Sequence, residues 1–167
     1  MRKFIIYQIV SQAEAAHGII FTPLDSLNKF GLREKLNLSL YDVVYQGTLE
    51  DDLELEDIYT AFQDRHHDGF KGHSLSISEI IEMEGKLYYC DRYDFKEISL
   101  PDVKPTIRKG DKFLCRKDYL TENNTVAYMK GRVYLSELDD CITSENGSVR
   151  QQMNEKTNFY QFFAKIA

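Results

Sequence analysis

The clearest pattern of apolar and polar positions in the chain is a pair of β-favouring runs around a short turn. Ile80–Met83 leads into Glu84-Gly85, and Lys86–Cys90 leads out of it. Glycine readily adopts the positive φ that two-residue hairpin turns require. The pattern therefore predicts a tight hairpin, and Phe95–Ile98 predicts a third strand after the polar turn at 91–94.

The residues before this hairpin predict strands that alternate with short helices. The runs at 4–10, 19–21 and 41–45 suit short strands. Thr22 and Pro23 suit the start of a helix, because threonine can cap the first turn and proline fits the first helical position. Residues 36–40 are ambiguous. At 74–78 three serines alternate with two apolar residues, which is a half-buried pattern.

A run of acidic residues precedes an amphipathic stretch in the first half of the chain. Six of the eight residues at 50–57 are carboxylates, and Leu55, Ile58 and Phe62 recur at helical spacing. Acidic side chains in the first turn complement the helix dipole. We therefore interpret the run as the start of a surface helix rather than as a metal or general-acid site.

The second half of the chain is predicted to be a separate all-β domain. Residues 99–107 hold two of the three prolines without periodicity, which is typical of a linker. Beyond them, short β-favouring runs separated by Gly and Asn turns lie at 112–117, 126–129, 132–135, 141–143 and 149–153. Such spacing favours a small SH3-like barrel. The last ten residues favour a turn of helix that leads into a closing strand.

Composition narrows the class of protein. The 167 residues are 43% hydrophobic and 13% aromatic, which suffices for a core without disulfides. The three cysteines form no CxxC pair, which excludes zinc-ribbon and thioredoxin-like classes, and free thiols indicate a reducing compartment. The apolar start lacks a cleavage site and is far shorter than the ~20 residues of a membrane span. We therefore expect a soluble, cytoplasmic protein without membrane contact.

Charge is distributed unevenly between the two halves. Residues 1–100 carry 10 basic and 18 acidic side chains, a net charge of −8, whereas residues 101–167 carry 11 and 9, a net charge of +2. The first half is therefore a poor match for a phosphate backbone. In the second half Lys109, Lys112 and Arg116 are the best candidates for nucleic-acid contact, since alternation puts Lys112 and Arg116 on one strand face. A solvated outer face is the alternative.

The candidate metal ligands and nucleophiles do not match a known motif. His66, His67 and His73 lie close in sequence, but adjacent histidines rarely bind one ion and no HExxH pair is present. His73-Ser74 with Asp68 lacks the GxSxG turn of a serine nucleophile. The cysteines lie in or beside apolar strands, where they behave as small hydrophobes. We therefore predict no catalytic residues, no metal and no cofactor.

Residues 3–98 resemble the YodL-like domain family, which occurs in proteins of phages, plasmids and conjugative elements. The matching blocks are FIIYQ at 4–8, FTPLDSLNKFG at 21–31, YDVVYQGTL at 41–49, LEDIYTAF at 55–62, and above all FKGHSLSISEII at 70–81 with KLYYCDRYDFKEI at 86–98. Many relatives carry Gly-Asp where this chain has Ser78-Glu79. Residues 108–167 resemble small barrel proteins of phages through KGDKFLCRKD, AYMKGRVY and DCIT.

These resemblances imply a mobile-element protein that acts in the bacterial cytoplasm, sometimes beside antirestriction genes, and neither implies catalysis. We expect an α+β protein with an antiparallel curled sheet and two or three short helices over 1–98, a linker at 99–107, and an SH3-like barrel over 108–167. The leading function is a non-enzymatic module that binds a protein, such as a component of a bacterial defence system. Its contact surface would be Glu50, Asp51, Asp52, Glu54 and Glu56. The alternative is nucleic-acid binding through the barrel, and an enzyme of unrecognised type is a third class.

Overall fold

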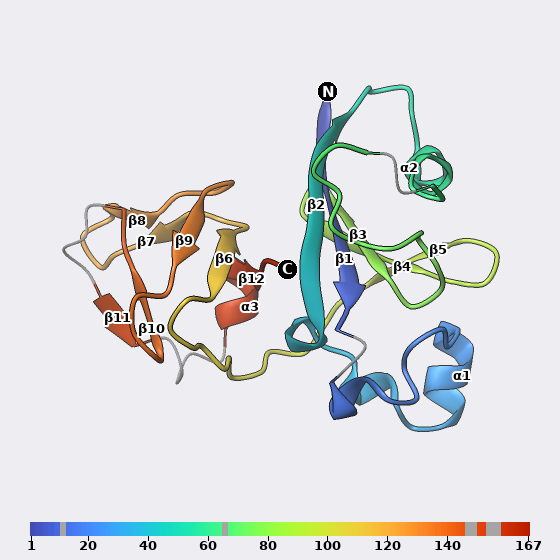
Figure 1. Ribbon diagram of the computed structural model, residues 1–167, viewed down its shortest axis with the longest axis horizontal. Helices are drawn as coiled ribbons and strands as arrows, with labels where there is room; N and C mark the ends of the chain where they lie inside the picture. Colours follow the sequence, from blue (N-terminus) through green and yellow to red (C-terminus); the bar gives the residue numbers. More distant parts are fainter. Residues whose placement is uncertain (11–12, 65–66, 146–149, 153–157) are drawn as a thin grey trace. The chain divides into compact units, whose positions relative to one another are not determined.

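The computed structural model describes residues 1–10, 13–64, 67–145, 150–152 and 158–167 (Figure 1). The chain divides into two compact units. Unit 1 comprises residues 1–36, 40–101 and 167, and unit 2 comprises residues 37–39 and 102–166. Among the described residues, no helix is long and apolar enough to cross a membrane.

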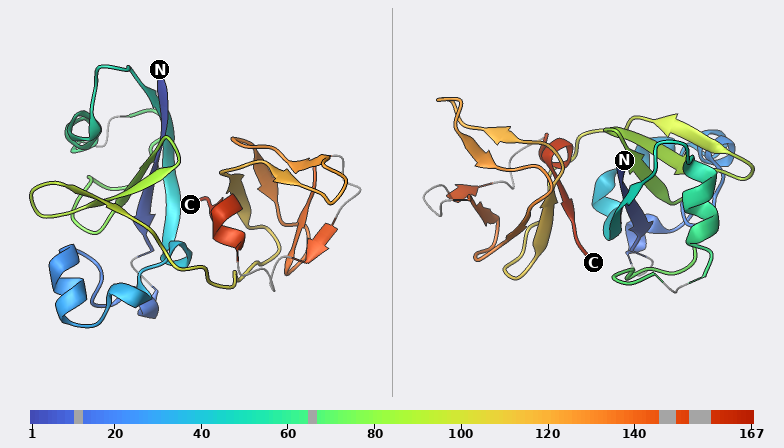
Figure 2. Two further views of the ribbon diagram at one scale, coloured as in Figure 1. Left: turned by 180° about the vertical axis from the view of Figure 1, so that it is seen from behind. Right: turned by 90° about the horizontal axis from the view of Figure 1, so that it is seen from above.

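Unit 1 is built on a five-stranded antiparallel sheet in the order β2-β1-β3-β4-β5 (Figure 2). Its strands are β1 (Arg2–Ile9), β2 (Tyr41–Leu49), β3 (Ile80–Met83), β4 (Lys86–Cys90) and β5 (Phe95–Ile98). Glu84 and Gly85 both have positive φ, at 53° and 79°, as the predicted two-residue turn requires. The predicted hairpin and its third strand are therefore confirmed.

One face of this sheet is covered by α2 (Leu55–Ala61). Ile58 and Phe62 of this region join Phe4, Ile6 and Ile81 of the sheet in one buried cluster. A capping box closes the start of the helix: the amide of Glu54 donates to the Asp57 carboxylate at 2.7 Å, and the Glu54 side chain accepts from the Asp57 amide. The predicted acidic start and apolar stripe of this helix are both confirmed.

The segment between β1 and β2 contains short helices: η1 (Glu14–Ala16), α1 (Leu24–Lys29), η2 (Arg33–Lys35) and η3 (Leu38–Leu40). The predicted strand at 19–21 is wrong. Gly18 and Phe21 have φ of 84° and 59°, so the backbone turns there instead of extending. The predicted threonine cap is also wrong, because Pro23 occupies the N-cap position and the Thr22 hydroxyl donates to the carbonyl of Gly18 at 2.9 Å.

Unit 2 is a small β-rich fold with three antiparallel sheets, in the orders β12-β6-β9, β7-β8 and β10-β11. Its elements are β6 (Lys112–Cys115), β7 (Tyr119–Leu120), β8 (Val126–Tyr128), β9 (Val133–Leu135), β10 (Cys141–Thr143), β11 (Arg150–Gln152), α3 (Phe159–Phe162) and β12 (Phe163–Lys165). The helix-then-strand prediction for the tail is confirmed. Closure of these sheets into an SH3-like barrel stays a prediction.

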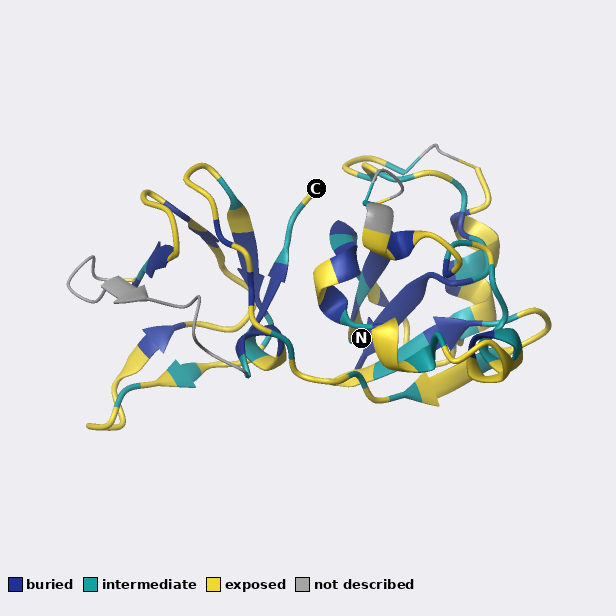
Figure 3. Cartoon of the chain, turned by 90° about the horizontal axis from the view of Figure 1, so that it is seen from below, coloured by how far each residue is buried: buried dark blue, intermediate teal, exposed yellow. Residues whose placement is uncertain are grey.

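Aromatic side chains form the core of unit 2. Phe113 packs edge-on against Phe159 at 5.4 Å between ring centroids, and Tyr128 packs edge-on against Phe163 at 5.1 Å. Edge-on contacts of this kind stabilise aromatic pairs beyond their area burial. Figure 3 shows buried residues on the strands of each unit and exposed residues on many of the connecting loops.

The strand pairing in unit 2 differs from the sequence prediction at one point. The runs around the Lys130-Gly131 turn do not pair with each other, because β8 pairs with β7 and β9 pairs with β6. This pairing places Tyr134 opposite Phe113, where it is only 7% exposed. The predicted strand after residue 147 does pair with β10, as β11, whereas the Asn146-Gly147 turn lies outside the described residues.

The stretch at 99–107 is divided between the two units. The boundary falls after Pro101, and the end of the stretch packs into unit 2, where Ile107 is 1% exposed. The carbonyl of Ile107 accepts a hydrogen bond from the Asp140 amide at 3.0 Å. Only the first residues of the predicted linker therefore lie between the units along the chain.

Limited proteolysis tests whether the two units fold as separate globules. We expect a protease of broad specificity, such as subtilisin, to cut first between Ser99 and Lys104, because Ser99, Pro101, Asp102 and Lys104 are exposed. Two resistant fragments of unequal size should accumulate, and mass spectrometry identifies the cut. A first cut inside β3-β4 or β6, or a chain that is degraded without fragments, would contradict the division.

Candidate functional site

A polar cluster lies at the end of the two central strands of unit 1. The recorded β1–β3 pairs run from Phe4↔Met83 to Tyr7↔Ile80. Continuing this register by one pair brings Gln8 opposite Glu79, just before β3 begins. Because side chains alternate along a strand, Gln8 points to the same face as Ile6 of the buried cluster. Sheet register therefore places two polar side chains beside an apolar core.

The carboxyl group of Glu79 is the centre of this cluster, and its side chain is only 3% exposed. Its Oε2 accepts hydrogen bonds from the Ser76 amide at 3.0 Å and from the Gln8 Nε2 at 3.1 Å. Its Oε1 lies 3.3 Å from Nε2 of His73, whose side chain is 46% exposed. The carboxyl thus has one oxygen held by the protein interior and one turned toward a half-exposed imidazole.

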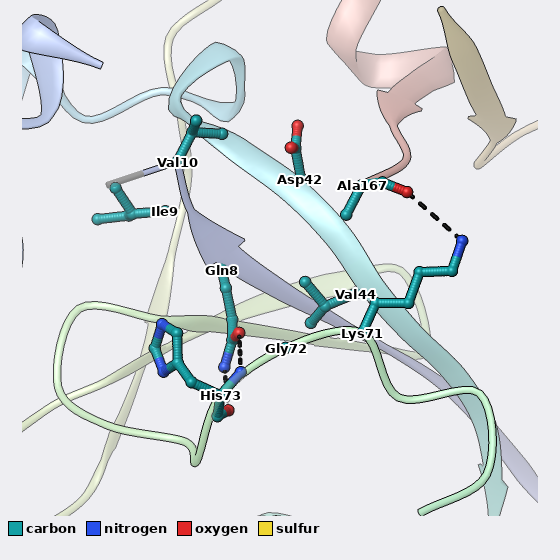
Figure 4. Close-up of a pocket in the computed structure, with 9 residues that line it drawn as sticks. All are labelled: Gln8, Ile9, Val10, Asp42, Val44, Lys71, Gly72, His73 and Ala167. Atoms are coloured by element: carbon teal, nitrogen blue, oxygen red, sulfur yellow. Dashed lines mark hydrogen bonds between the residues drawn. The ribbon is translucent and has the colours of Figure 1, made fainter. Parts of the chain in front are cut away.

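The side chain of Gln8 connects β1 to the loop before β3 through hydrogen bonds. Its Nε2 donates to the carbonyl of His73 at 2.7 Å, and its Oε1 accepts from the His73 amide at 3.0 Å (Figure 4). Gly72 makes this approach possible, since a Cβ there would lie 2.2 Å from Oε1 of Gln8. The role of this glycine is to let the Gln8 side chain approach the backbone closely.

Burial controls the protonation of Glu79. Loss of solvation raises the pKa of Glu79 to about 8, and the hydrogen bonds from Ser76 and Gln8 offset only part of this shift. The Ser76 hydroxyl also lowers this pKa. Glu79 therefore keeps its proton at neutral pH.

The hydrogen-bond partners fix where that proton lies. Nδ1 of His73 is 3.0 Å from the carbonyl of Ser74, which can only accept, so Nδ1 carries a hydrogen. In the neutral imidazole Nε2 is then an acceptor that faces Oε1 of Glu79. Because Oε2 already accepts two donors, the pair holds one proton between Oε1 of Glu79 and Nε2 of His73.

Ser78 carries backbone strain next to this pair. It is buried at 2% exposure and has a φ of 82°, a conformation that glycine adopts far more readily than serine. Its hydroxyl accepts a hydrogen bond from the Phe21 amide at 3.0 Å, and its carbonyl accepts one from the Tyr41 hydroxyl at 2.6 Å. A glycine at this position would relieve the strain, because glycine has no Cβ.

A cavity of about 230 Å³ opens beside Glu79. It is lined by Ile9, Ile20, Phe21, His73, Ser78 and Glu79, all of which belong to unit 1. Sequence reasoning missed this site, because it weighed His73 with Ser74 and Asp68 and with the neighbouring histidines, but not with Gln8 or Glu79. Two signals were present: Gln8 interrupts an apolar strand, and Glu79 directly precedes the apolar run of β3.

The acidic residues chosen from the sequence lie at the other end of β1. Glu50, Asp51, Asp52, Glu54 and Glu56 are all exposed. Glu54 is used in the capping box of α2, and Asp51 lies 2.7 Å from the amino group of Met1, which lowers the pKa of its carboxyl. Glu50, Asp52 and Glu56 make no ion pair within the part of the chain that the structure describes. We call these five residues the acidic surface.

The basic residues chosen from the sequence do not share an open face. Lys109 and Lys112 are exposed, but the Arg116 guanidinium is half-buried and donates to the carbonyl of Tyr160 in α3. Leu114, which alternation places on the same face as Lys112 and Arg116, is 1% exposed. The predicted open face of this strand is therefore wrong, because the consecutive residues Phe113, Leu114 and Cys115 are buried and both faces of β6 are covered.

The histidine and cysteine candidates are engaged in the fold. His67 stacks on Phe62 at 4.1 Å, and its Nε2 lies 2.6 Å from the carbonyl of Ala61, whereas His66 lies outside the described residues. Within the described ranges no group of three or more His, Cys, Asp or Glu side chains is arranged to hold a metal. All three cysteines are buried, and burial raises the pKa of the Cys90 thiol and raises that of Cys115 to about 11.

Replacing Glu79 with glutamine should change how stability depends on pH. The folded-state pKa is raised from 4.5 to about 8, so between these values the native state holds a proton that the unfolded state has lost. The free energy of unfolding therefore falls as pH rises through this window, by about 1.4 kcal/mol per unit. Glu79→Gln should remove this slope. Urea unfolding from pH 5 to 8 measures it.

Among the described residues, the titratable groups that face Glu79 are His73, Tyr41 and Cys90. Glu84→Gln is the control, because Glu84 is exposed in the hairpin turn and its removal should leave the slope intact. An unchanged slope in Glu79→Gln would contradict a buried, protonated carboxyl.

Substitutions at Ser78 should invert the usual preference for alanine over glycine. Both Ser78→Ala and Ser78→Gly lose the hydrogen bond to the Phe21 amide, but only glycine relieves the positive φ. Ser78→Gly should therefore be more stable than Ser78→Ala by about 1 kcal/mol in urea unfolding. Ser76 is the control, since its φ is not positive and alanine should be at least as stable as glycine there.

The comparisons with known proteins bear on unit 1. The model of the YodL-like domain matches residues 3–100, which is more than half of the chain and includes Gln8, His73, Ser78 and Glu79. No protein of curated function and no solved structure matches the chain. The family match ends where unit 1 ends and does not extend to the second predicted resemblance. The chain therefore belongs to the YodL-like domain family.

Proposed function

We propose that the protein is a non-enzymatic accessory protein of a phage or other mobile element, which acts by binding a basic protein partner through the acidic surface. The observation that carries the proposal is the exposure of five carboxylates around the start of α2 in a unit of strongly negative charge. Membership of the YodL-like family supports the mobile-element setting.

The physical role of such a surface is to steer association. Charges on an exposed surface contribute little to stability, but they raise the association rate with a partner of opposite charge. Glu50, Asp52 and Glu56 suit this role, because within the described residues none of them is neutralised by an ion pair. Glu54 contributes its charge while it caps the helix.

A bacterial defence protein is the partner that this chemistry favours. Proteins that act on invading nucleic acid bind phosphates through basic surfaces, which an acidic surface complements. Inhibition would follow from competition with the nucleic acid for those surfaces. Binding of nucleic acid by Lys109 and Lys112 of unit 2 is the alternative, and the arrangement of Arg116 gives it less support.

A charge-matched pair of variants tests the proposal. Replacing Glu50, Asp51 and Asp52 with serine should slow association with the partner severalfold, and the difference should shrink in high salt, because ions screen charges over ~8 Å at physiological strength. The matched control replaces Glu34, Asp68 and Glu84, which are exposed elsewhere in unit 1 and change the net charge equally. The control should bind normally.

The partner is first purified from nuclease-treated bacterial lysate, and association rates are then measured by biolayer interferometry. Equal loss in both triple variants would indicate net charge rather than the acidic surface. If the native chain instead shifts DNA or RNA at physiological salt, and replacing Lys109 and Lys112 removes the shift, the nucleic-acid alternative replaces the proposal.

A further inference from the structure

The cavity beside Glu79 has the chemistry of a small binding site. We propose that it binds a primary alkylammonium group, with the ammonium at Glu79 and its alkyl chain along the cavity wall. The cavity is about 230 Å³ and is lined by Ile9, Ile20, Phe21, His73, Ser78 and Glu79. Nothing in this inference depends on the acidic surface, which lies at the other end of β1.

One carboxyl oxygen of Glu79 can accept a new donor. Oε2 of Glu79 is occupied by the Ser76 amide and by Gln8, whereas Oε1 has only the imidazole of His73, 3.3 Å away. His73 is 46% exposed, so it can move aside without opening the core. An ammonium group can therefore reach Oε1 from solvent by displacing a single side chain.

The remaining walls fit the alkyl chain of such a ligand. Ile9 and Ile20 supply apolar surface. Phe21 also lines the cavity and is 62% exposed. The hydrogen bond from its amide to Ser78 holds this backbone in place. An aromatic ring beside a carboxyl group is the combination that attracts an ammonium cation, through cation–π contact and charge pairing.

Size and charge restrict the ligand further. At about 230 Å³ the cavity is smaller than the roughly 300–1,000 Å³ of sites for drug-sized ligands, so it suits one short chain rather than a cofactor. The carboxyl group of Glu79 in the cavity wall favours a cation over an anion. The ligand class is therefore an amine with a short aliphatic chain, either free or as the side chain of a lysine.

Binding replaces the proton of the Glu79–His73 pair with the ammonium group of the ligand. The ammonium enters with its positive charge, and the proton held between Glu79 and His73 leaves to solvent, so that a carboxylate faces the ammonium and His73 stays neutral. Because that proton is lost with a pKa of about 8, affinity should rise about tenfold per pH unit from 6 toward 8 and then level off. A ligand that needed the protonated carboxyl would show the opposite trend.

The test is a titration of the full chain with n-butylammonium chloride at constant ionic strength, followed by the backbone amide NMR signals of His73, Ser78 and Glu79. We expect saturable binding whose affinity rises tenfold per pH unit from 6 to 8. Glu79→Gln should abolish binding, and Phe21→Ala should weaken it severalfold. The control Glu84→Gln should bind as the native chain does, and neutral n-butanol should not bind.

A comparison of two amines identifies the source of the ligand, and further variants keep the test decisive. Putrescine is compared with Nα-acetyl-lysine N-methylamide, and the tighter ligand shows whether the site takes free amines or lysine side chains. If Glu79→Gln does not fold, the pH trend and the Phe21→Ala variant decide the outcome. Unchanged binding in the triple variant of Glu50, Asp51 and Asp52 separates this site from the acidic surface. Absent binding, or affinity that falls as pH rises, would overturn the proposal.

Discussion

The burial of one carboxyl group constrains how unit 1 is assembled. An ionised carboxylate removed from water is costly, so Glu79 is held protonated, and its carboxyl oxygens are contacted by groups from two segments of the chain. Gln8 comes from β1, whereas the Ser76 amide and His73 both come from the loop before β3. The sheet register brings these groups together, and their hydrogen bonds in turn fix the loop against the sheet.

Backbone strain at Phe21, in the segment before α1, lies next to the strained backbone of Ser78 beside Glu79. Phe21 and Ser78 both have positive φ, which costs an L-residue about 1–2 kcal/mol each. The hydrogen bond between the Phe21 amide and the Ser78 hydroxyl links the two strained positions. Tyr41 and Tyr89 add hydrogen bonds to the carbonyls of Ser78 and Thr22, at 2.6 Å each. The strain therefore lies where several bonds determine the backbone, which is typical of functional sites.

The sequence predicts the parts of the fold whose cause is local. The hairpin around Glu84-Gly85 follows from turn chemistry, and α2 follows from its acidic start and apolar spacing. Predictions fail where distant contacts override local pattern. Ile19 lies in a turn but is buried at 0% exposure, so its apolar character reflects packing rather than a strand. Leu114 and Arg116 likewise depend on β12 and α3, which are distant in sequence.

The candidate site escapes sequence reasoning for the same physical reason. His73 and Glu79 are six residues apart, yet their relation to Gln8 arises only from the β1–β3 register. The histidines and carboxylates that drew attention in the sequence are those that cluster along the chain, and clustering along the chain is typical of exposed loops and helix starts. A single carboxyl at a strand end gives little signal, although burial changes its chemistry most.

The two candidate surfaces of unit 1 are electrically independent, and this decides how each can act. From Arg2, beside the acidic surface, to Gln8 the extended strand spans about 20 Å, which exceeds the ~8 Å over which exposed charges act at physiological salt. The exposed carboxylates act through solvent and therefore respond to salt, whereas Glu79 is buried and responds to pH. One unit can therefore attract a basic partner at one end of β1 and recognise a single amine at the other, without either event altering the charge of the other site.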